Sequence, residues 1–154
     1  MYSFEEILEQ ELELELPTFD AELAFKLGMI AVERAKREDK VITVTVSIGR
    51  QTIFHYGAVA HGPNADHWLK RKCNVVYEYY MSSLRLGAKL TAQDSSLQIE
   101  GRSPKDFTDI GGGVPIRVKG LGVIGAMAIT GMPHVEDHDY VCDAIKTLKD
   151  EMTK

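Results

Sequence analysis

The segment Trp68-Leu69-Lys70-Arg71-Lys72-Cys73-Asn74 holds the densest group of side chains that could bind a ligand. On a helix, Trp68 and Lys72 are neighbours one turn apart. Arg71 and Lys72 could neutralise carboxylates or phosphates, and Trp68 offers a flat apolar surface beside them. Haem, with its two propionates, would suit this group, as would a small organic acid. In the alternative interpretation, Trp68 packs in the core or an interface and the cations pair with Asp or Glu elsewhere.

A second candidate site combines His134 and His138 with Asp137. The histidines are four residues apart at the expected start of the last helix, so their rings can share one face. With Asp137 they would form a two-histidine, one-carboxylate metal set. In the structural interpretation, His134 begins the helix and His138 packs near the apolar stripe of Val141. A helix N-terminus also disfavours a charged imidazolium.

His55 and a glycine run supply the remaining candidates. His55 lies between Phe54 and Tyr56, so on a strand its ring points away from both. It could ligate haem in a groove, or simply be a hydrogen-bonded sheet residue. Gly112 and Gly113 precede a strand, unlike a phosphate loop, which precedes a helix. Their N–H groups could bind an anion, or the glycines could permit positive φ or close backbone approach.

The helices that would position these residues have visible start signals. Ser3, followed three residues later by Glu6, predicts a capped N-terminal helical extension over 1–17, which packs on its own domain or on a neighbouring copy. Asp20 predicts the start of a second helix running to about residue 38. Asp66 is expected to cap a third helix over 67–86, and a last helix is expected after Pro133.

Four strands are expected in two hairpins. Two β-rich runs flank Gly49-Arg50, a two-residue hairpin turn. Residues 114–118 and 123–130 form the second pair, in which Pro115 belongs on an edge or at the start of a strand, and Gly125 allows a close approach. The polar stretch 93–109 is the candidate for a mobile or functional loop. Together these elements predict one α+β domain over 1–154, an antiparallel sheet with flanking helices.

Composition narrows the function classes. The chain has 154 residues, a mass of 17.2 kDa and a net charge of −5, which argues against nucleic acid as the main partner. The acidic N-terminus does not resemble a signal peptide, and the apolar runs are shorter than the roughly 20 residues that cross a bilayer. We therefore expect a cytoplasmic protein without a membrane partner. Cys73 and Cys142 are expected to be buried thiols rather than a disulfide or a metal pair.

Several fragments together resemble one family. Gly112-Gly113-Val114-Pro115-Ile116, Gly122-Val123-Ile124-Gly125 and Thr130-Gly131 are similar to the GlcG/HbpS-like family of haem-degrading domain proteins. Its cytosolic branch is similar also at the following positions: Phe54-His55-Tyr56, Pro63-Asn64, Trp68, Arg71-Lys72, Asn74-Val75-Val76, Ser82-Ser83 and Asp137-His138. The resemblance implies a profilin-like fold and assembly into homo-oligomers. Some members bind haem or iron.

These observations favour a cytosolic homo-oligomeric ligand-binding protein that takes haem, iron or a small carboxylate. The expected groove lies between the third helix and the glycine hairpin, lined by Trp68, Arg71, Lys72, His55, Gly112 and Gly113. Two alternatives remain open. One is an enzyme that processes haem or an organic acid, and the other is an interaction protein that assembles as a ring.

Overall fold

The computed structural model describes residues 2–154. A four-stranded antiparallel sheet has the strand order β2-β1-β4-β3. In chain order the elements are α1 (Phe4–Glu13), α2 (Ala21–Arg37), β1 (Thr43–Ile48), β2 (Gln51–Tyr56), the 3-10 turn η1 (Val59–His61), α3 (Pro63–Tyr79), α4 (Ser83–Ala92), β3 (Gly113–Val118), β4 (Gly122–Thr130) and α5 (His134–Met152). The predicted α+β, profilin-like architecture is confirmed.

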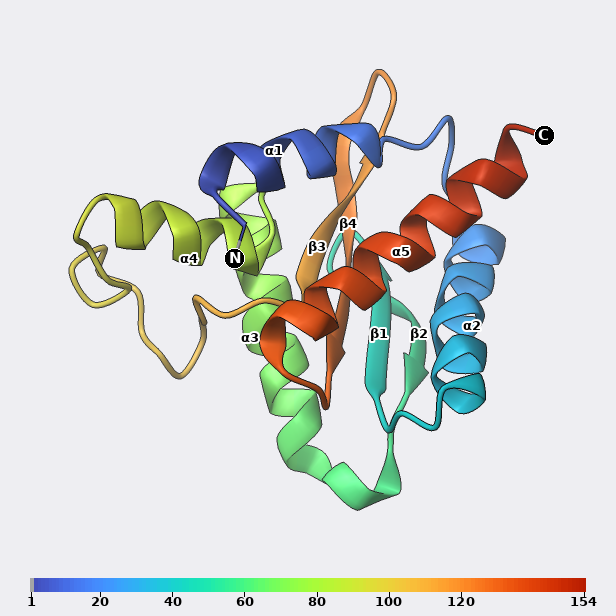
Figure 1. Cartoon of the computed structure of the whole chain (residues 1–154), viewed down its shortest axis with the longest axis horizontal. Coiled ribbons are helices and arrows are strands. Elements are labelled where there is room, and N and C mark those ends of the chain that lie inside the picture. The colour runs from blue at the N-terminus through green and yellow to red at the C-terminus, as the bar shows by residue number, and fades with distance from the viewer. Residues whose placement is uncertain (1) are drawn as a thin grey trace.

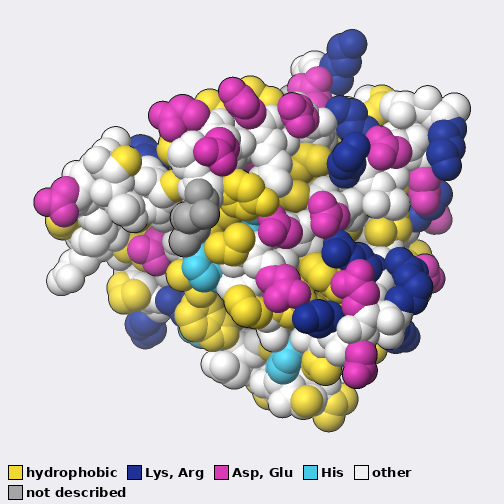
Figure 2. All heavy atoms as spheres, viewed as in Figure 1, with side chains coloured by type: hydrophobic (Ala, Val, Ile, Leu, Met, Phe, Trp, Pro, Cys, Tyr) yellow, Lys and Arg dark blue, Asp and Glu magenta, His cyan; other side chains and the backbone are white. Residues whose placement is uncertain are grey.

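Helices cover the two faces of the sheet. In Figure 1, α5 crosses in front of the strands with α2 beside it, and α3 runs behind them. The main core lies between α2, α5 and one sheet face, where Val44, Val46 and Ile129 are buried. A smaller core joins Leu69 and Val76 of α3 to the other face. Figure 2 shows the α5 side, with acidic side chains gathered over α1.

Strand β1 separates apolar from polar side chains, because successive residues point to opposite faces. Val44 and Val46 enter the main core, whereas Thr45 and Ser47 face α3. The β1–β2 hairpin turns at the predicted Gly49-Arg50, and β1 pairs with β4 on its other side. A polar row therefore lies under α3.

The third predicted helix is two helices. The prediction of one helix over 67–86 was wrong: α3 begins earlier, at Pro63, and Tyr80 then adopts a left-handed conformation with φ 54°. A new helix starts beyond it, since Ser82 accepts a hydrogen bond from the Arg85 N–H at 3.1 Å. Asp66 lies inside α3 rather than at its cap. Proline fits the first helical position because no helical partner is needed for its nitrogen there.

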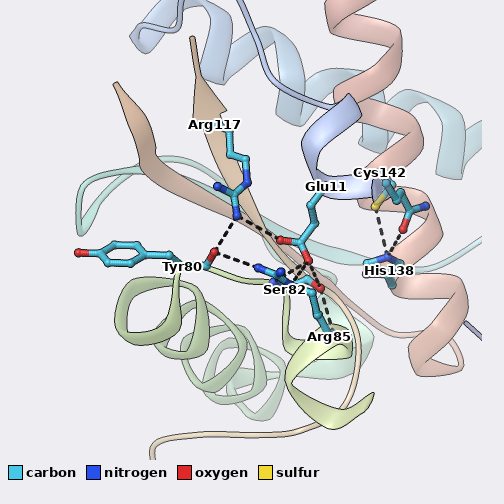
Figure 3. Close-up of polar contacts among 8 residues, drawn as sticks. Glu11, Tyr80, Ser82, Arg85, Arg117, His138 and Cys142 are labelled. Carbon is cyan, nitrogen blue, oxygen red and sulfur yellow. Dashed lines mark hydrogen bonds and ion pairs between the residues drawn. The ribbon is translucent and has the colours of Figure 1, made fainter. Parts of the chain in front are cut away.

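The N-terminal segment packs on its own domain. Ser3 caps α1 as predicted, accepting from the Glu6 N–H at 3.2 Å. The buried Glu11 carboxylate joins α1 to α4 and β3: it accepts from the Ser82 hydroxyl at 2.9 Å and pairs with Arg85 at 2.9 Å and Arg117 at 3.6 Å (Figure 3). These contacts hold α1 over the β3 edge of the sheet.

The sheet edge at β3 is covered by the residues that follow α1. Leu16 bridges to Val118 in a parallel sense and is completely buried. Pro115 sits on this edge strand, as predicted. Within residues 2–154, every helix is too short or too polar to cross a membrane.

Candidate functional site

A polar groove of about 410 Å³ lies between α3 and the β1–β2 hairpin. Helix α3 packs closely over β4, because Ala126 and Ala128 of that strand have small side chains. Strands β1 and β2 extend beyond the helix, and the groove lies there. The lining residues come from three elements: Thr45, Ser47, Arg50, Thr52, His55, Asp66, Leu69, Lys70, Cys73, Asn74 and Tyr77.

Hydroxyl groups form the floor of this groove. The Ser47 hydroxyl lies 2.6 Å from the Tyr77 hydroxyl, joining β1 to α3. The Thr45 hydroxyl donates to the Phe54 carbonyl at 3.3 Å. Burial raises the pKa of Tyr77, so its phenol stays protonated at neutral pH and can donate a hydrogen bond. Burial also raises the pKa of the Cys73 thiol to about 12, which keeps it unreactive.

One end of the groove holds a histidine–carboxylate pair. His55 Nε2 lies 3.1 Å from Asp66 Oδ1, and the two side chains are 40% and 56% exposed. A carboxylate bonded to one ring nitrogen fixes the imidazole tautomer and orientation. His55 therefore lines the groove between α3 and the β1–β2 hairpin, with Asp66 as its partner, and not the cleft beside the glycine hairpin that was predicted from sequence.

Two cations border the groove. The Arg50 guanidinium lies 4.7 Å from the centre of the Tyr77 ring and 3.6 Å from the Glu78 carboxylate. Lys70 lies on the exposed side of α3. Arginine and lysine present donors to an anion, and the neighbouring hydroxyls supply further hydrogen bonds. The arrangement suits a small organic anion.

Lys72 lies elsewhere than expected. Its side chain is 1% exposed, and Nζ donates to the Ile129 carbonyl at 2.8 Å and to Asp137 Oδ2 at 3.2 Å. Gly112 and Gly113 pack against it, and a Cβ on Gly112 would lie 2.5 Å from Lys72 Nζ. The expected cleft between α3 and the glycine hairpin is therefore filled by Lys72 itself, so the expectation that these three residues line a groove is corrected.

The cation expected beside Trp68 stacks on it. The Arg71 guanidinium lies 4.1 Å from the centre of the Trp68 ring, and its Nε donates to the Phe107 carbonyl at 3.2 Å. Trp68 is half-buried and lines a separate, shallow hollow with His61 and Met132. The two residues therefore do not border the α3 groove.

The predicted metal set is also corrected, since each of its members has another partner. His134 Nδ1 accepts from the Gly111 N–H at 2.9 Å, and Asp137 accepts from Lys72 and from the Met132 N–H. His138 is buried, with Nε2 at 2.8 Å from Gln10 Oε1. Among residues 2–154, no group of three or more His, Cys, Asp or Glu side chains is placed to hold a metal ion.

Burial governs the charge of these groups. It raises the pKa of Asp137 to about 6 against the opposing effect of Lys72, whose own pKa burial lowers. It lowers the pKa of His138 to about 4, so this imidazole is neutral at neutral pH. Cys142 Sγ lies 3.4 Å from His138 Nε2 (Figure 3). Both cysteines are buried and free, as predicted.

Part of the groove was not predicted from the sequence. Lys70 belongs to the candidate segment 68–74, but Arg50 appears in the sequence only as a turn residue and Tyr77 as an ordinary member of a helix. One signal was available, because Thr45 and Ser47 place hydroxyls on a single face of a strand whose other face is apolar. Hydroxyl groups in a row on one face of a central strand need hydrogen-bond partners, so they indicate a polar site on that face and not only an apolar core.

Comparisons with known proteins agree with this architecture. The family model for the haem degrading protein HbpS-like family matches residues 19–146. A UPF0303 protein of Pseudomonas entomophila is 34% identical over 143 residues, covering 92% of this chain and 79% of the relative. A UPF0303 protein of Mesorhizobium japonicum is 38% identical over 142 residues, covering 90% and 84%.

Solved structures share the fold. The Ybr137w protein superimposes with a TM-score of 0.89 at 22% identity, covering 98% of this chain and 90% of that one. A PduOC:heme complex gives a TM-score of 0.71 at 18% identity, covering 84% and 94%. HbpS gives 0.67 at 21% identity, covering 84% and 89%.

The fold and groove define an α+β, profilin-like protein with a polar pocket between a helix and the sheet. The chain belongs to the HbpS-like family, as the matching family model and the UPF0303 relatives show. The resemblance found in the sequence is confirmed.

Proposed function

We propose that this protein binds a small organic anion bearing a carboxylate in the groove between α3 and the β1–β2 hairpin. The observation that carries the proposal is the lining itself: Arg50 and Lys70 stand beside a floor of Ser47 and Tyr77 hydroxyls. Carboxylates accept charge-assisted hydrogen bonds from such cations, and these bonds are stronger than neutral ones. A groove of this size lies within the range of ordinary small-molecule pockets.

The proposal also covers the cellular compartment and the oligomeric state. We place the protein in the cytoplasm, as a homo-oligomer. The assembly is supported by the match to the HbpS-like family, whose members we expect to form homo-oligomers. Light scattering from the purified full chain tests the oligomer, and a mass equal to one chain would count against it.

Titration calorimetry with acetate, propionate and butyrate tests the binding proposal. Saturable binding is expected, weakened at least fivefold by Arg50→Gln or Lys70→Gln. Lys146→Gln is the matched control, because Lys146 is an exposed lysine of α5. Absence of binding, or binding that the two groove variants leave unchanged, would overturn the proposal.

Haem is a second candidate ligand, favoured by a specific observation. His55 faces the groove with Asp66 on one ring nitrogen, the arrangement in which a histidine commonly serves as a metal ligand. The family description names haem degradation, and a neighbour's structure is a haem complex. In this chain the groove would hold the porphyrin beside His55, with Arg50 and Lys70 available to its propionates.

An absorbance titration with haemin tests this second candidate. A saturable shift of the Soret band is expected, and it should be lost in His55→Ala. His67→Ala is the control, since His67 is exposed on α3 and does not line the groove. A Soret shift that persists in His55→Ala would show that haem binds elsewhere, and absence of any shift would exclude haem as the ligand.

A further inference from the structure

A second pocket lies on the β3 side of the sheet. It has a volume of about 520 Å³ and is enclosed by the start of α1, one face of α4, and the residues just before β3 and at the start of α5. Strand β3 is at the opposite edge of the sheet from β2, and Figure 1 shows α1 and α4 on that far side. This pocket is therefore separate from the carboxylate groove beside β2.

One face of α4 forms the floor of the pocket. The residues of this helix that line it are spaced as a single helical face: Leu84, Gly87, Ala88, Thr91 and Ala92. Three of the five have a small side chain or none, so this face leaves open space above it. At Gly87 the loop before β3 packs directly on the helix, since a Cβ there would lie 2.1 Å from the Asp109 carbonyl oxygen.

Two aromatic side chains from the start of α1 form a wall of the pocket. The Tyr2 hydroxyl donates to Asp139 at 2.9 Å, and the centre of the Phe4 ring lies 5.4 Å from the Arg85 guanidinium. Both rings are half-buried, and an aromatic ligand can stack on them or meet them edge to face. An enclosed cavity of about 150 Å³ holds benzene, so this larger, open pocket has room for a molecule of two rings.

His134 supplies a hydrogen-bond donor to this pocket. Its Nδ1 accepts from the Gly111 N–H at 2.9 Å, so the neutral ring carries its proton on Nε2. In the part of the chain that the structure describes, this is the ring's one hydrogen bond, and the half-buried side chain lines the pocket. Once a ligand excludes water, a donor without a partner is costly. The ligand is therefore expected to carry an oxygen that accepts from Nε2–H.

The charges of the lining argue against an anionic ligand. Glu5 and Asp109 contribute two exposed carboxylates, and among the described residues no lysine or arginine borders the pocket. Helix N-termini attract anions, but the first turns of α1 and α5 each already hold two acidic residues. An ammonium ion, for its part, has no acceptor for the His134 proton. The acceptor oxygen therefore belongs to a neutral molecule.

We propose that this pocket binds a small neutral aromatic molecule that bears an oxygen acceptor, of which a phenol is the simplest kind. The rings lie on the small residues of α4 beside Tyr2 and Phe4, and the oxygen accepts from His134 Nε2. This site does not depend on the carboxylate groove.

A fluorescence titration of the full chain at pH 7 with 2-naphthol tests the proposal. Naphthalene, which lacks the oxygen, and 2-naphthoate, which is charged, are then added as competitors for bound 2-naphthol, so that carboxylate binding in the groove does not enter the measurement. We expect 2-naphthol to bind at least fivefold more tightly than naphthalene and at least tenfold more tightly than 2-naphthoate. Absence of 2-naphthol binding, or equally effective competition by 2-naphthoate, would overturn the proposal.

Two variants locate the bound molecule. Ala88→Leu fills the floor and should weaken 2-naphthol binding at least tenfold, whereas Ala21→Leu, at an exposed position of α2, should leave it unchanged. His134→Phe keeps a flat ring and removes the donor, so 2-naphthol affinity should fall to that of naphthalene while naphthalene affinity stays the same. His67→Phe, on the exposed side of α3, is its control. Thermal unfolding checks that each variant is folded. Wild-type binding of 2-naphthol by folded Ala88→Leu or His134→Phe would overturn the assignment of this pocket.

Discussion

Lys72 Nζ lies 3.2 Å from Asp137 Oδ2, and both side chains are almost completely buried. The pair joins α3 on one side of the sheet to the first turn of α5 on the other, past the end of β4. Asp137 also accepts from the Met132 N–H at 3.1 Å, which fixes the turn that leads into α5. The two residues that we expected to bind ligands therefore secure the two layers to each other.

Removal of the lysine should be costly. In Lys72→Met the Asp137 carboxylate stays buried without its cation, and loss of one partner of a buried pair costs about 3–5 kcal/mol. The free energy of unfolding, measured by urea denaturation, should fall by that amount. Lys70→Met, two residues away and exposed, should change it by less than about 0.5 kcal/mol.

The double variant Lys72→Met/Asp137→Leu distinguishes the loss of the ion pair from the cost of leaving the Asp137 carboxylate buried without a cation. Replacing both charges by apolar groups removes the stranded carboxylate, so part of the lost stability should return. A Lys72→Met protein as stable as the wild type would contradict the role of the pair.

The sequence predicted the sheet and most helix starts, because those depend on neighbours in the chain. Ser3 and Asp20 cap their helices, and the Gly49-Arg50 turn joins two alternating runs. The burial of Lys72 depends on a partner 65 residues away. The three consecutive cations have different surroundings: Lys70 lines the groove, Arg71 stacks on Trp68, and Lys72 is buried against Asp137. The position of α3 against the sheet determines these differences.

The groove was harder to predict for the same reason. His55 was identified as a candidate because histidine can ligate haem, and on a strand its ring points away from Phe54 and Tyr56. The Arg50 guanidinium stacks on the Tyr77 ring, although the two residues belong to different elements. No sequence spacing predicts this contact. The small Ala126 and Ala128 let α3 pack over β4. Strand β2 is then left uncovered and the groove forms beside it, which cannot be inferred from the order of residues in the chain.

The buried carboxylate of Glu11 should anchor the N-terminal helix. Glu11→Gln keeps the shape of the side chain and removes the charge that faces Arg85 and Arg117. Since a buried cation left without its partner is strongly destabilising, the free energy of unfolding should fall by about 3 kcal/mol. Glu9→Gln, exposed on the same helix, is the control. Hydrogen exchange should quicken in α1 before the sheet, and unchanged protection of α1 would contradict this anchoring role.

Gly125 should be needed for the close approach of β1 and β4. A Cβ there would lie 2.1 Å from the Ser47 carbonyl oxygen, so the two strands must separate to admit it. Gly125→Ala should lower stability by about 1–3 kcal/mol, as overpacking does, and weaken carboxylate binding by displacing Ser47. Thermal unfolding and calorimetry measure the two effects. Gly57→Ala, whose Cβ would make only a 3.5 Å contact with His55, should be tolerated.

His138 should make the protein lose stability in acid. Its pKa is about 4 in the folded chain, against an ordinary value of 6.5, because burial disfavours the charged ring. The unfolded chain therefore binds the proton more tightly, and the free energy of unfolding decreases as the pH falls from 6.5 toward 4. A shift of this size corresponds to about 3 kcal/mol at pH 4.

Asp137 acts in the opposite direction over the same range. Its folded pKa of about 6 exceeds the ordinary 3.8, so the folded chain holds the extra proton and gains stability as the pH falls. The wild-type profile contains both effects. Comparison with His138→Gln isolates the histidine, since Asp137 is present in both proteins and its contribution cancels in the difference.

Urea denaturation at pH 7, 6, 5 and 4 measures that difference. The stability of the wild type relative to His138→Gln should decline by about 3 kcal/mol between pH 7 and pH 4. His67→Gln, an exposed histidine on α3, should follow the wild-type profile. A difference that stays constant across this range would mean that His138 is protonated in the folded protein. The buried ring would then need a partner for its second nitrogen, whereas Nδ1 has none among residues 2–154.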